Sequence, residues 1–352
     1  MKTSIAVMAA VAALTLAACG DSADSAESDA DAGSSDTGSS ETAETADTFP
    51  VTVEHAYGET TIESEPERVA TVAWANHEVP LALGIVPVGM SKATWGDDDD
   101  NGVLPWVEDK LEELDAETPV LFDETEGIDF EAVADTAPDV ILASYSGITQ
   151  EEYDTLSKIA PTIAYPDIAW GTSMEDMITM NSEALGKAAE GQQLVADLDA
   201  EIAEKFAAHP DIAGKSGMFA FIDPTDMSQV GFYTTHDTRP AFLEQLGMTT
   251  PPVVSDASAG SEEFYLSTSA EQADDFADVD VMITYGDTEG EMLKQLQADP
   301  LISQIPAIAR GSVVMLEDST PLAAAANPSP LSIGWALDDY LDLISEAVGK
   351  VG

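Results

Sequence analysis

The chain has 352 residues, and 67 Asp and Glu against 12 Lys and Arg give it a formal net charge of −55. So acidic a surface repels phosphate backbones, which excludes nucleic acid as a partner. A single cysteine excludes an internal disulfide framework. The excess of acid is also typical of proteins adapted to high salt, where charges are strongly screened.

The first 18 residues have the layout of a secretory signal peptide. Lys2 is followed by an apolar run over residues 5–16, which is too short to span a bilayer, and then by small residues that lead to Cys19. This arrangement resembles a bacterial lipobox, in which Cys19 becomes the lipid-bearing first residue of the mature chain. The alternative is an ordinary signal peptide with a chance cysteine. We therefore expect a protein on the extracytoplasmic face of the cell membrane, held there by a lipid anchor only.

Residues 19–48 are predicted to be the lipidated cysteine followed by a disordered acidic tether. Between residues 21 and 48 the chain is almost wholly Asp, Glu, Ser, Thr, Ala and Gly, without an aromatic or large aliphatic residue. Such a segment cannot bury enough apolar surface to offset its ordering entropy. A flexible chain of this length reaches on the order of 30 Å, so it would hold a folded body above the membrane.

The rest of the chain is long enough for two α/β lobes, expected over residues 49–172 and 210–352 with a linking helix over 173–209. Short apolar runs alternate with segments of helical periodicity, which indicates βαβ units around parallel sheets. The elements expected in the first lobe are strands at 69–74, 86–89, 140–143 and 162–165 and helices at 77–83, 130–137 and 149–159.

The linking segment is predicted as one long helix. Residues 174–208 contain no proline and their apolar residues recur at helical spacing, while Gly186 and Gly191 weaken the pattern. A strand pattern resumes at residues 217–222, and no segment of the lobes reaches transmembrane length. We therefore predict an α/β fold in which two lobes with central parallel sheets are joined by a long backbone helix.

A weak internal repeat supports the division into two lobes. Glu131 and Glu271 each begin a short helix that leads to a buried strand, and Tyr145 and Tyr285 follow at the ends of those strands. Because ligands bind beyond the carboxyl ends of strands in open α/β sheets, the two tyrosines are candidates to face each other across an interlobe cleft. Alternatively, each tyrosine only seals the top of its own lobe.

The order and spacing of several segments resemble the ferric-siderophore and cobalamin class of substrate-binding proteins of ABC importers. The resemblance covers most of residues 49–352 and depends on the order of the segments, since no single one is diagnostic. The segments are 66–70, 81–89, 131 with 137–142, 156–161, 165–172 and 310–314. The resemblance implies a class III periplasmic-binding-protein-like fold and a monomer that captures a small ligand and delivers it to an importer permease.

Two glutamates acquire a role from this resemblance. It implies that Glu131 and Glu271, one on each lobe, dock onto arginines of the permease. A carboxylate on each lobe and a guanidinium fork on the partner would give an oriented and reversible contact. Alternatively, each glutamate only offsets the dipole of its own helix.

The resemblance also implies an interlobe cleft for an iron chelate. Such a ligand needs aromatic walls with a few hydrogen-bond donors rather than direct metal ligands. Tyr233 is placed with Arg239 at the start of the second lobe's first helix, and Tyr265 in a loop; any one of the aromatic residues could instead belong to the core. The predicted ligand-binding residues are Trp74, Trp95, Tyr145, Trp170, Tyr233, Arg239, Tyr265 and Tyr285.

Arg239 stands out because basic residues are so scarce. A cation at the start of a helix opposes the macrodipole, which suggests a use such as gripping oxygens of a chelate; a surface ion pair is the alternative. The net charge favours a ferric hydroxamate, which is neutral or cationic, over a tris-catecholate complex with about three negative charges. Haem or cobalamin are alternative ligands, and no separate cofactor is expected.

Residues 97–108 also satisfy the pattern of an EF-hand calcium loop, with glycine at the sixth position. A proline and a tryptophan fall inside the loop and no convincing helix precedes it. A solvated acidic loop is therefore favoured over a calcium site. The candidate ligands would be Asp97, Asp99, Asn101 and Glu108.

Other chemistry finds little support. The four histidines are dispersed and only His77 and His236 could approach the cleft, which disfavours the capture of a bare metal ion. The Gly-Lys-Ser at residues 214–216 precedes a strand, whereas a phosphate loop follows one. No nucleophile elbow occurs and the sole cysteine belongs to the lipobox, so a binding protein is expected rather than a hydrolase.

Overall fold

The structure is a computed structural model that describes residues 48–352. The predicted signal peptide, Cys19 and nearly all of the predicted tether lie outside the described residues. The described residues belong to one compact unit. Within the described residues, every helix is too short or too polar to cross a bilayer.

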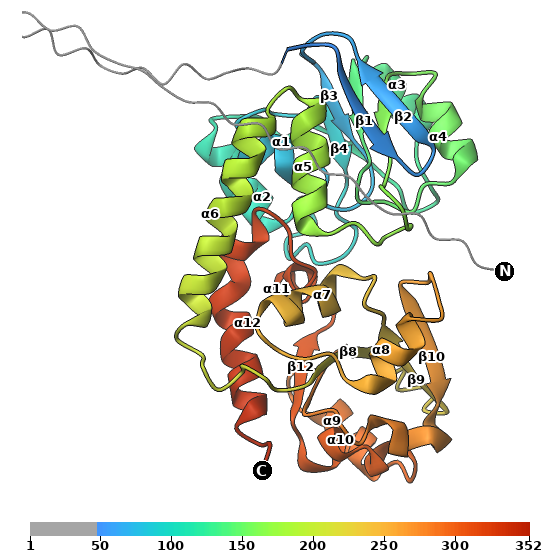
Figure 1. Cartoon of the computed structure of the whole chain (residues 1–352), viewed down its shortest axis with the longest axis vertical. Helices are drawn as coiled ribbons and strands as arrows, with labels where there is room; N and C mark the ends of the chain where they lie inside the picture. The colour runs from blue at the N-terminus through green and yellow to red at the C-terminus, as the bar shows by residue number, and fades with distance from the viewer. Residues whose placement is uncertain (1–47) are drawn as a thin grey trace, which may run out of the picture. The chain divides into compact units, whose positions relative to one another are not determined.

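The first lobe, in the upper part of Figure 1, is built on a parallel five-stranded sheet. Its central strands are buried at every residue, as is usual when helices cover both faces. In spatial order the strands are β5 (Val120–Phe122), β4 (Gly89–Ser91), β3 (Val69–Thr71), β6 (Val140–Leu142) and β7 (Thr162–Ile163). The helices of this lobe are α1 (Glu78–Ala82), α2 (Pro105–Glu113), α3 (Phe130–Asp135) and α4 (Gln150–Leu156).

A short hairpin precedes this sheet. Its strands, β1 (Val51–His55) and β2 (Gly58–Ile62), pair antiparallel. The hairpin is tied to the lobe by the hydroxyl of Thr60, which donates a hydrogen bond to the Thr162 carbonyl at 2.9 Å. It therefore belongs to the first lobe.

The segment predicted as one long helix consists of two, α5 (Met174–Ala184) and α6 (Ala188–Phe206). The break falls at Gly186, whose φ of +67° is a left-handed conformation that a helix interior does not use. A Cβ at Gly186 would lie 2.6 Å from the ring of Phe49, so the backbone also approaches a side chain closely there. Gly191, in contrast, continues inside α6.

The second lobe contains a mixed five-stranded sheet. β9 runs antiparallel to both of its neighbours, because a short connection from β8 turns the chain back on itself. In spatial order the strands are β10 (Tyr265–Ser269), β9 (Gln229–Tyr233), β8 (Gly217–Phe221), β11 (Val281–Gly286) and β12 (Val313–Glu317). The helices of this lobe are α7 (Thr238–Gln245), α8 (Pro252–Ser258), α9 (Glu291–Ala298) and α10 (Pro306–Arg310), with 3₁₀ turns at Ala270–Phe276 and Ile302–Gln304.

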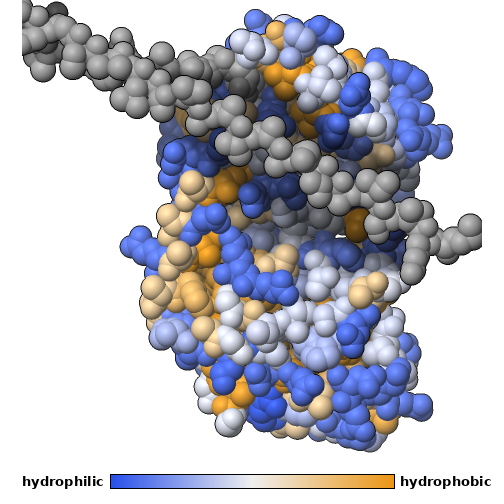
Figure 2. Space-filling model, viewed as in Figure 1, coloured by the Kyte–Doolittle hydropathy of each residue, from blue (hydrophilic) through white to orange (hydrophobic). Residues whose placement is uncertain are grey.

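The C-terminal segment returns to the first lobe. After α11 (Pro321–Ala325), helix α12 (Ser332–Val348) packs beside α6, as Figure 1 shows. Trp335 of α12 lies 5.5 Å from the ring of Trp106 in the first lobe, measured between centroids. The lobes are therefore joined both by the α5–α6 pair and by this returning segment. Hydrophilic residues cover most of the face visible in Figure 2.

The predicted fold class is confirmed, since two α/β lobes with largely parallel central sheets are present. The strands are shorter than predicted. The run 69–74, for example, leaves the sheet after Thr71, because Ala73 adopts a left-handed φ of 61°. This turn matters for the site, since it is the point where the chain reaches the junction of the lobes.

Candidate functional site

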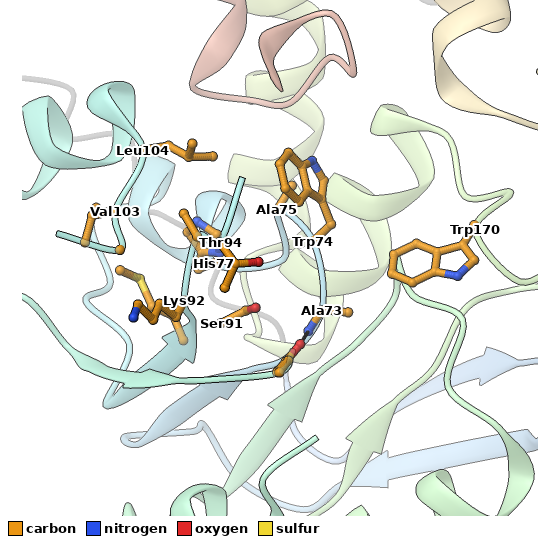
Figure 3. A pocket seen from close by; sticks show the side chains of 14 residues that line it. Ala73, Trp74, Ala75, His77, Ser91, Lys92, Thr94, Val103, Leu104 and Trp170 are labelled. Atoms are coloured by element: carbon orange, nitrogen blue, oxygen red, sulfur yellow. Dashed lines mark hydrogen bonds between the residues drawn. The ribbon is translucent and has the colours of Figure 1, made fainter. Parts of the chain in front are cut away.

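Two adjoining cavities lie at the carboxyl-end side of the first-lobe strands. The interlobe cavity has a volume of about 220 Å³ and draws on both lobes. The first-lobe cavity has a volume of about 180 Å³ and shares Trp74 and Trp170 with it (Figure 3). The interlobe cavity is lined by Trp74, Trp95, Tyr145, Trp170, Asp237, Arg239, Phe264 and Asn327.

A continuous chain of aromatic rings runs from the second-lobe sheet into the first lobe. Neighbouring ring centroids are 5.3 to 6.5 Å apart, and most pairs meet edge to face or tilted, which are the favoured geometries. The register of β8, β9 and β10 puts Phe219, Tyr233 and Tyr265 on one face of the sheet. In order, the rings belong to Tyr265, Tyr233, Phe219, Tyr285, Trp95 and Trp74.

Arg239 lies on this aromatic surface. Its guanidinium carbon is 4.1 Å from the centroid of the Tyr233 ring, a cation–π contact. Asp237, the N-cap of α7, accepts a hydrogen bond from Nη1 of Arg239 at 2.9 Å. Burial raises the pKa of Asp237 and the charge of Arg239 opposes this. Nε of Arg239 is buried without a hydrogen-bond partner among the described residues, so the guanidinium has donor capacity left for a ligand.

Hydrogen bonds join the lobes beside the interlobe cavity. Tyr145 of the first lobe accepts a hydrogen bond from Nδ2 of Asn327 at 3.0 Å, and its hydroxyl is 3.3 Å from that of Thr238. At a second point Nε1 of Trp95 donates to Asp318 at 3.2 Å. Tyr145 is only 4% exposed, so its hydroxyl serves the contact between lobes while its ring lines the cavity.

Trp170 is seated by a close backbone approach. A Cβ on Gly147 would lie 2.1 Å from Nε1 of the Trp170 side chain, so only glycine fits there. The backbone N–H of Trp170 donates to the Ser146 carbonyl at 2.8 Å, and its φ of 62° is left-handed. The Trp170 ring lines both cavities, and Figure 3 shows it at one side of the first-lobe cavity.

The first-lobe cavity contains two titratable groups, the half-buried Glu124 and the buried His77. Glu124 accepts a hydrogen bond from the Ala73 N–H at 2.9 Å through Oε2, whereas its buried Oε1 has no partner among the described residues. Burial raises the pKa of Glu124 to about 7, although the Ala73 N–H and the side chain of Ser91, which lines the same cavity, lower it. Burial also lowers the pKa of His77 to about 4, so its ring is neutral at physiological pH.

The structure brings the predicted ligand-binding residues together. Trp74, Trp95, Tyr145, Trp170 and Arg239 line the interlobe cavity directly. The other predicted residues, Tyr233, Tyr265 and Tyr285, contact this group through the aromatic chain and through Arg239 but are not part of the cavity lining.

Two of the predicted positions differ in their local structure. Tyr233 ends β9 rather than beginning a helix, and Tyr265 begins β10 rather than lying in a loop. The two residues are direct partners in the antiparallel ladder, which is why their rings meet.

Sequence reasoning missed several residues of the site. The position of Asp237 two residues before Arg239, as an acid opening a helix, is a recognisable N-cap signal. Phe219 lies inside an apolar strand and carries no signal of its own. The missed residues are Glu124, Phe219, Asp237, Phe264 and Asn327.

Glu131 and Glu271 occupy equivalent places in the two lobes. Each is exposed and is the second residue of a short helix, α3 for Glu131 and the 3₁₀ turn Ala270–Phe276 for Glu271. The preceding caps, Asp129 and Ser269, accept hydrogen bonds from backbone N–H groups with their side chains. Both carboxylates therefore remain available to a partner, as well as to the helix dipole.

Side chains of the acidic loop form hydrogen bonds within the loop. The carboxylates of Asp97, Asp98 and Asp99 come within 4.8 Å of one another, but Glu108 is not part of this group. Asp97 accepts hydrogen bonds from the N–H groups of Asp99 and Gly102, Asp99 accepts one from the N–H of Asn101, and Asn101 donates to Glu108. The loop geometry is thus accounted for by these turns.

The two histidines nearest the cleft are separated from each other. His77 lines the first-lobe cavity, whereas Nε2 of His236 lies 2.9 Å from the Ser261 carbonyl. Among the described residues, histidine does not take part in a group of three potential metal ligands.

Comparisons with known proteins agree on one family. A family model described as periplasmic binding protein matches residues 69–320. The solved structure of PiaA from Streptococcus pneumoniae TIGR4 in complex with ferrichrome is 45% identical, with a TM-score of 0.83, and the match covers 86% of this chain and all of that one. A second structure of PiaA from the same strain, described as an iron-uptake ABC transporter substrate-binding protein, has a TM-score of 0.78 at 45% identity and covers 85% of this chain and all of that one.

A curated relative adds a second kind of match. The probable siderophore-binding lipoprotein YfiY of Bacillus subtilis is 27% identical over 238 residues. The match covers 66% of this chain and 68% of that protein.

Proposed function

This chain belongs to the periplasmic binding protein family, and we propose that it is a lipid-anchored receptor that captures a ferric siderophore and delivers it to an ABC importer. Family membership, predicted from the order of the sequence segments, is confirmed by the match over residues 69–320. The family consists of binding proteins. Capture and release without turnover is accordingly the proposed activity.

One observation carries the proposal. A protein that matches 86% of this chain at 45% identity is solved in complex with ferrichrome. This chain has an aromatic interlobe cavity whose lining includes Arg239. Aromatic walls can pack against the organic shell of an iron chelate, and the free N–H groups of Arg239 can donate to its oxygens. Such a site binds the chelate as a whole and leaves the iron to the siderophore.

A ferric hydroxamate is the chelate that suits this cavity. Ferrichrome is a ferric hydroxamate, and ligands of this class are neutral or cationic. Asp237 already neutralises Arg239, so the cavity has no excess of positive charge with which to hold a highly anionic complex against a net charge of −55. The charge balance of the cavity and the similarity to the ferrichrome-bound protein therefore both favour a ferric hydroxamate.

Delivery would use the two exposed glutamates, one on each lobe. We propose that Glu131 and Glu271 dock onto basic residues of the permease, since each is exposed in the first turn of a short helix on its lobe. Cys19 would carry the lipid, which is consistent with the lipoprotein among the relatives. The receptor would work as a monomer.

The test is a tryptophan fluorescence titration of the protein with ferrichrome, a ferric tris-catecholate, haem and cobalamin. Trp74, Trp95 and Trp170 line the cavities, so bound chelate should quench their emission. We expect saturable quenching at submicromolar ferrichrome, none with iron-free ferrichrome, and an unchanged chelate afterwards. Quenching by haem or cobalamin alone would replace the proposed ligand within the same family, and chemical conversion of the chelate would contradict a pure binding function.

A further inference from the structure

The first-lobe cavity has features that capture of a neutral chelate does not require. It opens beside the interlobe cavity, with which it shares Trp74 and Trp170, and Glu124 belongs to its lining. Two indole rings and a carboxylate are groups that together recognise a cation. The ring faces attract positive charge through their quadrupole, and the carboxylate supplies the opposite charge.

Within residues 48–352, Glu124 forms no ion pair with a cationic side chain. One carboxylate oxygen bonds to the Ala73 N–H, and the other is buried without a hydrogen bond in the described part of the chain. A buried acceptor without a donor costs about 1–3 kcal/mol. A bound cation would offset this cost by interacting with the carboxylate oxygen that has no donor.

Lys92 does not fill this role. It lines the same cavity, but none of the ion pairs found within residues 48–352 joins it to Glu124. In Figure 3 Lys92 lies across the cavity from Trp170. It also lines a neighbouring polar cavity together with three aspartates, which offer it counter-charges. These are Asp97, Asp100 and Asp123.

Backbone strain is concentrated in the same cavity. Ala73, Ala75 and Trp170 have φ values of 61°, 60° and 62°, a left-handed conformation that costs about 1–2 kcal/mol for a residue other than glycine. Ala73 donates its N–H to Glu124, and Trp170 supplies one of the rings. Strained residues of this kind gather at ligand clamps, where the surrounding structure holds them in place.

We propose that the first-lobe cavity is a subsite for the protonated amine of a hydroxamate chelate, with Glu124 as the specificity-determining residue and Trp74 and Trp170 as its walls. The inference rests on the proposed function, because the iron-binding core of the same ligand would occupy the interlobe cavity. An uncharged substituent can fill the subsite but cannot pair with Glu124. The subsite therefore selects among chelates whose iron-binding groups are identical.

The titration of Glu124 gives this selectivity a pH dependence. Burial raises the pKa of Glu124 to about 7, and a cation pairs only with the ionised form. Preference for the amine should increase as the pH rises through about 7 and fade below it. The charge of Glu152 on α4 also raises the pKa of Glu124, while burial lowers the pKa of His77 to about 4 and keeps it neutral. Lys92 is the other charged residue in the cavity lining.

The test compares two chelates with one iron-binding core. Ferrioxamine B is a ferric tris-hydroxamate with a free terminal ammonium, and its N-acetyl derivative lacks only that charge. Fluorescence titration of the full chain at pH 8 should show ferrioxamine B binding about tenfold more tightly, which corresponds to about 1.4 kcal/mol. Glu124→Gln should remove the preference by weakening only the amine form. Glu126→Gln, the same change at an exposed residue of the same loop, should keep it.

Each outcome separates this inference from the proposed function. Equal affinity of the unmodified protein for both chelates would overturn the subsite and leave siderophore capture standing. A preference retained by Glu124→Gln would overturn the role of Glu124. Failure of ferrichrome and both ferrioxamines to bind would overturn the proposed function and the subsite with it. Unchanged affinity of Glu124→Gln for the acetylated chelate shows that its cleft is intact.

Discussion

Asp237 fixes the guanidinium of Arg239 in the interlobe cavity. Its Oδ2 accepts a hydrogen bond from Nη1 at 2.9 Å, and its Oδ1 accepts one from the backbone N–H of Arg239, also at 2.9 Å. Asp237 is only 2% exposed, so water competes little for these bonds. The arginine is therefore held in one orientation over Tyr233 before any ligand arrives, and its charge is balanced.

Replacement of this aspartate should change both affinity and selectivity. In Asp237→Asn the arginine loses its charged partner, so we expect about tenfold weaker binding of ferrichrome, equivalent to about 1.4 kcal/mol. The cavity also gains one uncompensated positive charge, which should favour anionic chelates relative to neutral ones. Parallel titrations with ferrichrome and a ferric tris-catecholate measure both effects. Asp256→Asn, an exposed change in the same lobe, is the control, and a variant that keeps wild-type affinity and selectivity would contradict this role.

The two exposed glutamates should matter for transport and not for capture. The double variant Glu131→Gln, Glu271→Gln should lose most siderophore uptake in cells, because each lobe loses the charge that meets the permease. Its affinity for ferrichrome should stay within about twofold of the original, since neither residue lines the interlobe cavity or the first-lobe cavity.

A matched pair of acids tests whether position or total charge is responsible. Asp135 and Asp275 are exposed and lie on the same two short helices, so the double change to asparagine removes equal charge. Uptake by this control should be nearly normal. Equal loss of uptake in both double variants would assign the effect to the overall field of the protein instead of to docking at Glu131 and Glu271.

The fold class could be predicted from the sequence because buried parallel strands have short continuous apolar sequences that alternate with amphipathic helices. Two features could not. The antiparallel direction of β9 depends on its pairing with β8 and β10, and the break at Gly186 also involves a close approach to the ring of Phe49, which is far away in the chain. Periodicity is a local signal, so it cannot register contacts of this kind.

Residues of the candidate site could be predicted from the sequence where their residue type is rare in this chain or where they follow a predicted strand. Tryptophans after predicted strands and an isolated Arg239 met that condition. Glu124 did not, since it is one of 67 acids and becomes distinctive only when the left-handed turn at Ala73 brings a backbone N–H to it. The functional meaning of an abundant residue type comes from its partners, and those are set by tertiary structure.

A buried carboxyl at the junction with α12 should make stability depend on pH. Glu78 is 1% exposed; its oxygens accept hydrogen bonds from Trp106 Nε1 at 2.8 Å and from the Leu331 N–H at 2.9 Å. Burial raises the pKa of Glu78 from 4.5 to about 7, although these bonds lower it. The folded state then holds a proton that the unfolded state releases, so stability is greatest below about pH 4.5 and falls as the pH rises to about 7.

The Glu78→Gln variant isolates this contribution. The raised pKa of Glu78 means that the unmodified protein should lose about 3 kcal/mol of stability as the pH rises. The variant should not show this loss, because glutamine does not titrate. Its amide leaves one N–H donor of the junction unpaired, so at pH 5 it should be less stable than the original by about 1–3 kcal/mol. By pH 8 the difference should vanish or reverse. Urea unfolding at both pH values measures this, with Glu112→Gln, a change at an exposed residue of α2, as control; a constant difference would contradict the raised pKa.

The hydroxyl of Tyr145 should contribute to stability and little to binding. It accepts a hydrogen bond from Asn327 at 3.0 Å and lies 3.3 Å from Thr238, so it joins the lobes instead of facing a ligand. Tyr145→Phe keeps the ring that lines the interlobe cavity and leaves Nδ2 of Asn327 without this acceptor. We expect a loss of about 1–2 kcal/mol in the free energy of unfolding and ferrichrome affinity within about threefold of the original.

Two measurements on the Tyr145→Phe variant decide between a structural and a ligand-binding hydroxyl. Urea unfolding reports the bond between lobes, and the ferrichrome titration reports any bond to the chelate. Tyr265→Phe is a suitable comparison, because Tyr265 belongs to the aromatic chain but lies at the edge of the second-lobe sheet. If Tyr145→Phe lost tenfold in affinity at unchanged stability, its hydroxyl would have to leave Asn327 and bond to the ligand, and the lobes would then be held together by the chelate itself.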